Sequence, residues 1–84
     1  MARPTDRSDT LTSFGANLRR LRVQAGLTQA KLAELANVEL RTEQKWERGE
    51  INPPLTTVVR IQGMFGCKWE VLLGQPKTKR VHAA

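Results

Sequence analysis

The stretch Leu27–Gly49 reads LTQAKLAELANVELRTEQKWERG, and it contains two short amphipathic segments separated at Asn37-Val38. The first segment carries apolar Ala and Leu residues at helical spacing, and the second ends in a charged and aromatic cluster followed by a glycine. Asn tolerates the left-handed backbone conformation that ends a helix. The stretch therefore predicts two helices joined by a tight turn, the second running from about residue 39 to 48.

Apolar residues at three- and four-residue spacing predict one more helix before this stretch and two after it. The first begins after Ser13, which is a good N-cap residue, and ends at Gly26. The later two span roughly 55–65 and 68–73. We find no strand pattern and no internal repeat. The expected fold is all-α, a compact bundle of five short helices over residues 13–74.

The two ends of the chain have a different composition from this bundle. Residues 1–12 are polar and include Pro4, so we expect a flexible N-terminal arm. Residues 75–84 carry Lys77, Lys79 and Arg80 without an apolar pattern, and we expect a basic, disordered tail.

Length and charge restrict the class of protein. The 84 residues suffice for one small domain. Fourteen Lys and Arg against eight Asp and Glu give a net charge of +6, which favours a polyanionic partner such as nucleic acid, with simple solubility as the alternative. The single Cys67 cannot form an internal disulfide, and we expect it to be a small apolar residue at a helix junction. No apolar run approaches the ~20 residues of a membrane span, and no signal peptide is visible, so a cytoplasmic location is expected.

In order and spacing, these features resemble the phage repressor and Cro type of helix-turn-helix protein, the XRE family. The matching positions are the basic run ending in Arg22, then Gly26-Leu27-Thr28-Gln29, Leu32-Ala33, Val38, Trp46-Glu47-Arg48-Gly49, Asn52-Pro53, Leu55, Ile61, Phe65-Gly66 and Leu72-Leu73. The resemblance covers about Phe14 to Gly74. It implies a lambda-repressor-like domain whose second turn-flanking helix lies in the major groove of double-stranded DNA.

The resemblance also implies roles for individual residues. Those expected to contact DNA bases are Glu39, Leu40, Arg41, Gln44 and Lys45. Those expected to contact phosphates are Thr28, Gln29, Arg48 and Asn52. Arg22 and Glu47 occupy the positions of a partly buried salt bridge between the first and third helices.

The chemistry of the third helix agrees with these roles. Arg41 and Lys45 are four residues apart, so they share one helix face. Arginine can bond guanine O6 and N7 together, lysine can reach guanine or a phosphate, and Leu40 can pack on a thymine methyl group. Glu39 suits the first turn of a helix and can accept a hydrogen bond from cytosine. The alternative for these exposed charges is simple solvation.

Three positions depart from the family pattern. Glu43 stands where family members usually carry an apolar residue between the second and third helices, and a carboxylate buried there without a partner is costly. Either it reaches solvent or a basic side chain, or the domain is weakened, or the third helix is rotated. Gln62 and Pro54 are milder departures, from a usual alanine and a usual capping hydroxyl residue.

Family members dimerise so that two recognition helices meet successive turns of the major groove. We expect a homodimer that is weak in solution, with Trp69 and Val71 at its interface; the alternative for Trp69 is that it closes the small core. A small transcriptional regulator, most often a repressor in this family, is the first interpretation. The antitoxin of a toxin pair, with a toxin as protein partner, and the controller of a restriction-modification system are the alternatives.

An enzyme is not expected. His82 is the only histidine and lies in the predicted tail, and no Ser/His/Asp set, metal-ligand cluster or phosphate-binding loop is visible. We accordingly expect no catalytic residue, no metal site and no cofactor.

Overall fold

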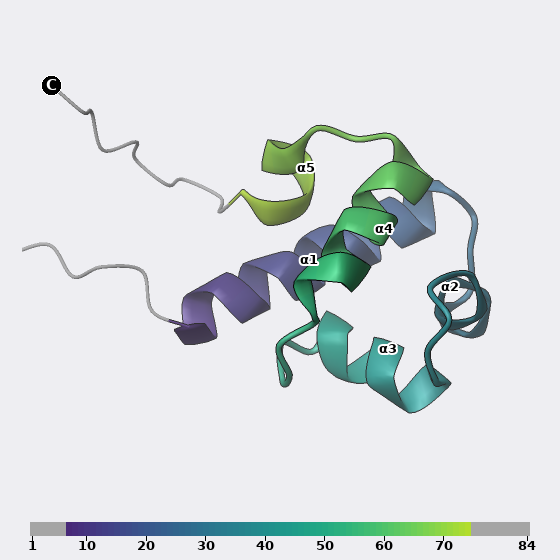
Figure 1. The fold of residues 1–84 in the computed structure, drawn as a ribbon, viewed down its shortest axis with the longest axis horizontal. Helices are drawn as coiled ribbons and strands as arrows, with labels where there is room; N and C mark the ends of the chain where they lie inside the picture. Colours follow the sequence, from purple (N-terminus) through teal and green to yellow (C-terminus); the bar gives the residue numbers. More distant parts are fainter. Residues whose placement is uncertain (1–6, 75–84) are drawn as a thin grey trace, which may run out of the picture.

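The computed structural model describes residues 7–74, which form five helices and, within that range, no strand. The helices are α1 (Arg7–Gln24), α2 (Gln29–Leu35), α3 (Leu40–Glu47), α4 (Leu55–Phe65) and α5 (Trp69–Leu73). In Figure 1, α1 crosses the middle of the molecule, α4 lies in front of it, and α2 and α3 lie to the other side from α5. The predicted all-α fold of five short helices is confirmed.

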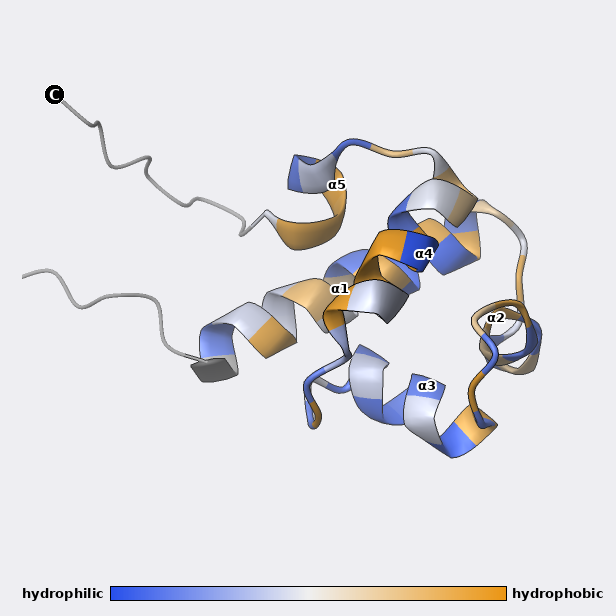
Figure 2. Ribbon diagram, in the orientation of Figure 1, coloured by the Kyte–Doolittle hydropathy of each residue, from blue (hydrophilic) through white to orange (hydrophobic). Residues whose placement is uncertain are grey.

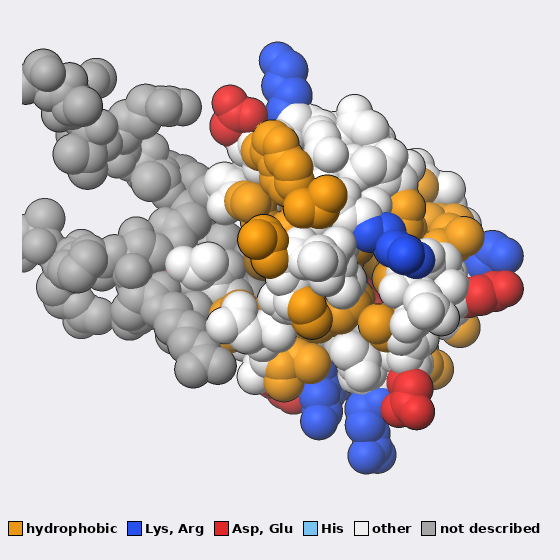
Figure 3. Space-filling view, in the orientation of Figure 1, with side chains coloured by type: hydrophobic (Ala, Val, Ile, Leu, Met, Phe, Trp, Pro, Cys, Tyr) orange, Lys and Arg blue, Asp and Glu red, His pale blue; other side chains and the backbone are white. Residues whose placement is uncertain are grey.

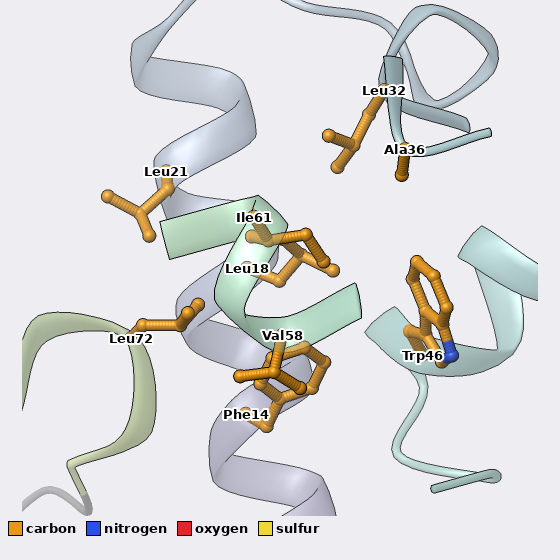
Figure 4. Packing of buried hydrophobic residues seen from close by; sticks show 9 residues of the cluster. All are labelled: Phe14, Leu18, Leu21, Leu32, Ala36, Trp46, Val58, Ile61 and Leu72. Carbon is orange, nitrogen blue, oxygen red and sulfur yellow. The ribbon is translucent and has the colours of Figure 1, made fainter. Parts of the chain in front are cut away.

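A single apolar core joins all five helices, as Figure 4 shows. Its buried members are Phe14, Leu18, Leu21, Leu32, Ala36, Trp46, Val58, Ile61 and Leu72. Burial of such side chains contributes roughly 1.5–3 kcal/mol each relative to exposure, which is the main force that holds short helices together. Cys67 packs at the edge of this core between α4 and α5, where it is half-buried.

The first helix begins earlier than predicted. It starts at Arg7, so the prediction of a flexible arm over residues 1–12 is wrong for residues 7–12, which are helical. Leu11 is buried beside α5, and this tertiary packing extends the helix past Ser13, which lies in the helix interior rather than at its cap. Residues 1–6 and the predicted tail, 75–84, lie outside the described residues.

Two apolar side chains next to the core remain partly exposed. Leu35 of α2 is 43% exposed and Met64 of α4 is 36% exposed. Both lie on the border of their helix faces, where a small domain has too few neighbouring elements to cover them.

The turn between α2 and α3 has the predicted form. Asn37 adopts a φ of +61°, the left-handed conformation that reverses the chain after α2. The backbone N–H of Val38 then donates to the carbonyl of Ala33 at 2.9 Å, and the Val38 side chain packs against the core. The direction in which α3 leaves the turn is thereby determined.

A close backbone contact holds α3 against α1. A Cβ atom at Gly15 would lie 2.4 Å from the carbonyl oxygen of Trp46 and 2.7 Å from that of Glu47. Atoms do not approach so closely without a shift of the backbone, so only glycine fits at position 15 in this arrangement. The end of α3 therefore rests directly on the main chain of α1.

Candidate nucleic-acid interface

Helix α3 has one face in the protein and one in solvent. Its inward side chains are Glu43 and Trp46, which are 0% and 1% exposed. Glu39, the N-cap, and Leu40 and Arg41 in the first turn are all exposed. Figure 2 shows that α3 is hydrophilic along most of its length, as expected of a helix that presents one face to a partner.

The cations of α3 lie on its outer side. Arg41 is exposed, and within the described part of the chain its guanidinium has no ion-pair partner. Lys45, one turn later, is half-buried. Lys and Arg side chains project beyond the edge of the molecule below α3 in Figure 3. An acidic side chain projects beside them in the same view, and of the α3 cations it is Arg41 that is exposed without a carboxylate partner among the described residues.

A chain of side-chain hydrogen bonds joins α1, α2 and α3. Arg22 donates from Nε to Glu47 at 2.6 Å and from Nη2 at 3.2 Å, with 13% and 4% of the two side chains exposed. The Gln29 amide donates to Glu47 Oε1 at 3.1 Å and accepts from the Gln44 amide at 3.3 Å. Arg22 also donates to the carbonyl of Leu27 at 2.9 Å. A bidentate arginine–carboxylate pair of this kind is directional as well as strong, so it orients α3 relative to the two preceding helices.

The charge state of Glu47 follows from these bonds. Burial alone raises the pKa of a carboxyl group, but the interaction with the neighbouring Glu43 and the hydrogen bonds from Arg22 and Gln29 outweigh it and hold the pKa of Glu47 below its ordinary value. The hydrogen bond with Glu47 raises the pKa of Arg22 further above its already high value. The pair is therefore fully ionised at neutral pH.

Residues 13–67, which include α2, the turn and α3, match the family described as a helix-turn-helix domain. The chain belongs to this helix-turn-helix family. A protein of Pyrobaculum aerophilum named as an HTH-type transcriptional regulatory protein is 42% identical over 57 residues, which are 68% of this chain and 23% of that protein. The chain thus spans less than a quarter of the length of this curated relative.

Solved structures of helix-turn-helix proteins share the architecture. The hypothetical transcription factor NHTF from Neisseria, 25% identical, superposes with a TM-score of 0.74 over 92% of this chain and 88% of its own. The restriction-modification controller protein C.AhdI from Aeromonas hydrophila, 31% identical, has a TM-score of 0.67 over 74% of this chain and 94% of its own. The repressor LexA from Eubacterium rectale, 20% identical, has a TM-score of 0.74 over 89% and 80% of the two chains and supports the fold alone.

Within the helix-turn-helix domain, the predicted phosphate-contacting residues lie in different settings. Thr28 is the N-cap of α2, where its hydroxyl oxygen accepts from the backbone N–H of Lys31 at 3.0 Å. Arg48 forms an exposed ion pair with Glu50 at 2.7 Å, which sequence reasoning did not foresee. Asn52 is exposed at the rim of an apolar groove of about 300 Å³ between α1, α4 and α5.

Gln44 differs from the other predicted base-contacting residues of the helix-turn-helix domain. It is half-buried and its amide is engaged by Gln29, whereas Glu39, Leu40 and Arg41 are exposed. The position of Gln44 therefore suits a brace between α2 and α3 at least as well as a contact with a base.

Glu43 is the least expected feature of the domain. It is fully buried, and neither carboxylate oxygen accepts a hydrogen bond from the described part of the chain. Burial, together with the neighbouring Glu47, raises the pKa of Glu43 to about 8. Glu43 therefore reaches neither solvent nor a basic side chain of its own among the described residues.

Sequence reasoning missed Asn17, a buried polar residue of α1. Its Nδ2 donates to the carbonyls of Leu72 and Gly74, both at 2.9 Å, and its Oδ1 accepts from Arg20 at 3.1 Å. These bonds satisfy carbonyl groups at the end of α5 and tie that helix to α1. A signal was present, since position 17 falls on the same helix face as the apolar residues at positions 14, 18 and 21.

The predicted self-contact residues lie on an exposed apolar surface. Trp69 and Val71 of α5 are 43% and 38% exposed, so neither is merely part of the core. Figure 3 shows apolar side chains gathered over α5 and the adjoining part of α4.

Among residues 9–74, no three His, Cys, Asp or Glu side chains lie together in a way that suits a metal ion. No helix in the described part of the chain has both the length and the apolar character that crossing a membrane requires.

Proposed function

We propose that this protein binds double-stranded DNA in a sequence-specific manner and acts as a small transcriptional regulator, with α3 in the major groove. The observation that carries the proposal is the two-sided character of α3. Its inner side chains are buried, and its first turn and Arg41 stand free in solvent. The names of the relatives, a transcriptional regulatory protein and a controller protein, support the same function.

The proposed contacts follow from exposure and chemistry. Arg41 is free to make a bidentate bond to guanine, and Leu40, 43% exposed, offers an apolar contact to a thymine methyl group. Lys45 would reach a base or a phosphate one turn further on, and Glu39 would accept from cytosine at the first turn. Gln44 would contribute chiefly through its bond to Gln29.

We further propose that phosphate contacts come from the residues around α2 and from the loop after α3. The Thr28 hydroxyl and the Gln29 amide, which lie next to each other at the start of α2, would donate to one phosphate. Arg48 and Asn52 would contact the backbone on the far side of α3. In this scheme Arg48 must exchange Glu50 for a phosphate.

A homodimer that forms weakly in solution and assembles on a two-fold symmetric operator completes this proposal. Two recognition helices must lie one turn of DNA apart, about 34 Å, to read adjacent major grooves. The exposed Trp69 and Val71 supply the apolar surface for such a contact. A cytoplasmic protein that represses the gene it binds is the form of regulation we expect.

Control of a restriction-modification system is a second candidate. The controller protein C.AhdI is 31% identical, and the match covers 94% of its chain and 74% of this one. The assignment would be tested by finding whether the selected operator precedes restriction and modification genes.

The experiment is a selection of genomic DNA fragments with the purified protein at about 150 mM salt, because salt sets the ratio of specific to non-specific binding. We expect one enriched motif with two-fold symmetry. Arg41→Ala should lose about 1–3 kcal/mol of discrimination at a single base pair of that motif. Arg48→Ala should instead weaken all sequences to a similar extent and reduce the salt dependence.

Two results would contradict the proposal. Equal affinity for the motif, for random duplex and for heparin would indicate a general polyanion binder. An unchanged motif after Arg41→Ala would show that Arg41 does not read a base.

A further inference from the structure

Glu43 lies on α3 next to the side-chain hydrogen bonds among Arg22, Gln29 and Glu47 that join α1, α2 and α3. It is 0% exposed and both oxygens lack a hydrogen-bond donor in the described part of the chain. Glu47 follows it by one helical turn on the same helix, so the two carboxyl groups share one face of α3. An ionised Glu43 would thus place two negative charges side by side in the protein interior.

The cations around Glu43 do not compensate for a second negative charge. Arg22 of α1 is the cation whose field reaches Glu43, and its guanidinium already binds Glu47 through two hydrogen bonds. From α2, Gln29 contributes a neutral amide that is also directed at Glu47. The other charged side chains described on the packed helices are exposed: Asp9, Arg19 and Arg20 on α1, Lys31 and Glu34 on α2, Arg41 on α3 and Arg60 on α4. Lys31 and Glu34 pair with each other at 3.4 Å. Lys45 of α3 is half-buried, and its field reaches Glu50.

A proton on Glu43 removes both the repulsion from Glu47 and the need for a second cation. The neutral carboxyl group donates a hydrogen bond to Glu47, which is then held by Glu43, Arg22 and Gln29 together. A buried neutral carboxyl costs far less than a buried unpaired carboxylate. One positive charge, on Arg22, and one negative charge, on Glu47, then remain in the cluster and balance each other.

We propose that Glu43 holds a proton in the DNA-binding form of the domain and that loss of this proton displaces α3, so that DNA binding is linked to pH. The inference rests on the proposed function, since it concerns regulation of the same surface. Ionised Glu43 repels Glu47, and Glu47 is the acceptor that connects Arg22 and Gln29 to α3. Release of this acceptor also frees Gln44, whose partner is Gln29.

The pH range over which DNA binding should change follows from the pKa of Glu43. Because burial and the neighbouring Glu47 raise the pKa of Glu43 to about 8, the protonated form predominates at neutral pH and is lost as the pH rises through that value. If only the protonated form binds DNA, the apparent Kd rises by up to tenfold for each pH unit above the pKa of Glu43.

The test measures two quantities between pH 6 and pH 9. The first is the titration of the Glu43 side-chain carboxyl carbon by nuclear magnetic resonance, without DNA. The second is the Kd for the selected operator duplex at constant ionic strength. Three proteins are compared: wild type, Glu43→Gln, which imitates the neutral acid in size and donor, and Glu34→Gln, which removes an exposed carboxylate from α2 as a matched control.

We expect the wild-type carboxyl to titrate near pH 8 and the wild-type Kd to rise above that pH, with Glu34→Gln behaving alike. Glu43→Gln should bind with a Kd that is flat across the range. A Glu43 carboxyl that titrates near its ordinary value, or a wild-type Kd as flat as that of Glu43→Gln, would overturn the inference. Absence of operator binding by the wild type at every pH would overturn the proposed function and the link with it, even if the carboxyl titrates high. If Glu43→Gln does not fold, the wild-type titration still decides the matter.

Discussion

At the scale of single residues, Glu43 is the side chain whose chemistry fits its surroundings least well. A carboxyl group occupies a site that is closed to solvent and offers it no donor. Replacement of such a group by an apolar side chain of similar volume is often stabilising, by about 1–4 kcal/mol.

We therefore expect Glu43→Ile to raise the melting temperature at pH 7, by several degrees for each kcal/mol in a domain of this size. Differential scanning calorimetry measures the change, and Glu34→Ile on the exposed face of α2 is the control. A lower or unchanged value would mean that the carboxyl group is better accommodated than its burial indicates.

The free energy of unfolding should also depend on pH, with contributions of opposite sign from Glu43 and Glu47. The folded state binds the Glu43 proton more tightly than the unfolded chain, so stability falls as the pH rises from the ordinary glutamate value toward about 8. The slope from this group is at most about 1.4 kcal/mol per pH unit. Glu47 has the opposite sign, because its pKa is lowered: its contribution is present above the ordinary value and is lost in acid.

Urea unfolding at a series of pH values would measure both effects. Glu43→Gln should abolish the decline toward pH 8 and leave the loss of stability in acid. A wild-type free energy of unfolding that rises between pH 5 and pH 8 would contradict the assignment.

Sequence reasoning at this scale succeeded where the signal was local. The departure at Glu43 was visible through the family resemblance, because a charge stands where family members usually carry an apolar residue. Its consequence was not, since burial of Glu43 depends on how α1 and α2 cover α3. The bond between Arg48 and Glu50 and the bonds of Asn17 to the end of α5 likewise need coordinates, because each depends on a choice of side-chain conformation.

At the scale of helices, the contact between α1 and α3 depends on the absence of a side chain. We expect Gly15→Ala to destabilise the domain, because its Cβ would meet the Trp46 carbonyl oxygen at 2.4 Å and only a backbone shift relieves that contact. Strain from overpacking of this kind typically costs about 1–3 kcal/mol.

Gly63→Ala is the matched control. Position 63 lies inside α4 and has no atom within 4 Å of an added Cβ. Alanine there should stabilise the helix by about 0.5–1 kcal/mol. Chemical denaturation of the two variants should therefore give shifts of opposite sign, and equal shifts would mean that α1 and α3 are not in close backbone contact.

The ends of α4 could be predicted from the sequence, whereas the start of α1 could not. Helix α4 begins and ends where predicted, because Pro54 and Gly66 give unambiguous signals, and Gly66 adopts the left-handed conformation. Helix α1 begins earlier than predicted because Ser13 is a good capping residue that is not used as one. The packing of Leu11 near α5 outweighs that local preference.

At the scale of the whole molecule, the exposed apolar surface over α5 governs association. We expect Val71→Arg to weaken self-association and to reduce cooperative binding to a two-site operator, while the binding of one protomer to a half-site stays unchanged. Val23→Arg on α1 is the control, because Val23 is also exposed, at 58%, and lies outside this surface. Sedimentation velocity over a range of concentrations measures the first effect, and the same association in both variants would argue against α5 as the interface.

The length of α1 bears on how the domain unfolds. Its 18 residues span about 27 Å, and both α3 and α5 pack on it. Amide hydrogens near Leu18 should therefore exchange with deuterium only through global unfolding. The groove-reading helix and the association surface then belong to one cooperative unit, so heat should abolish both activities at a single temperature rather than in succession.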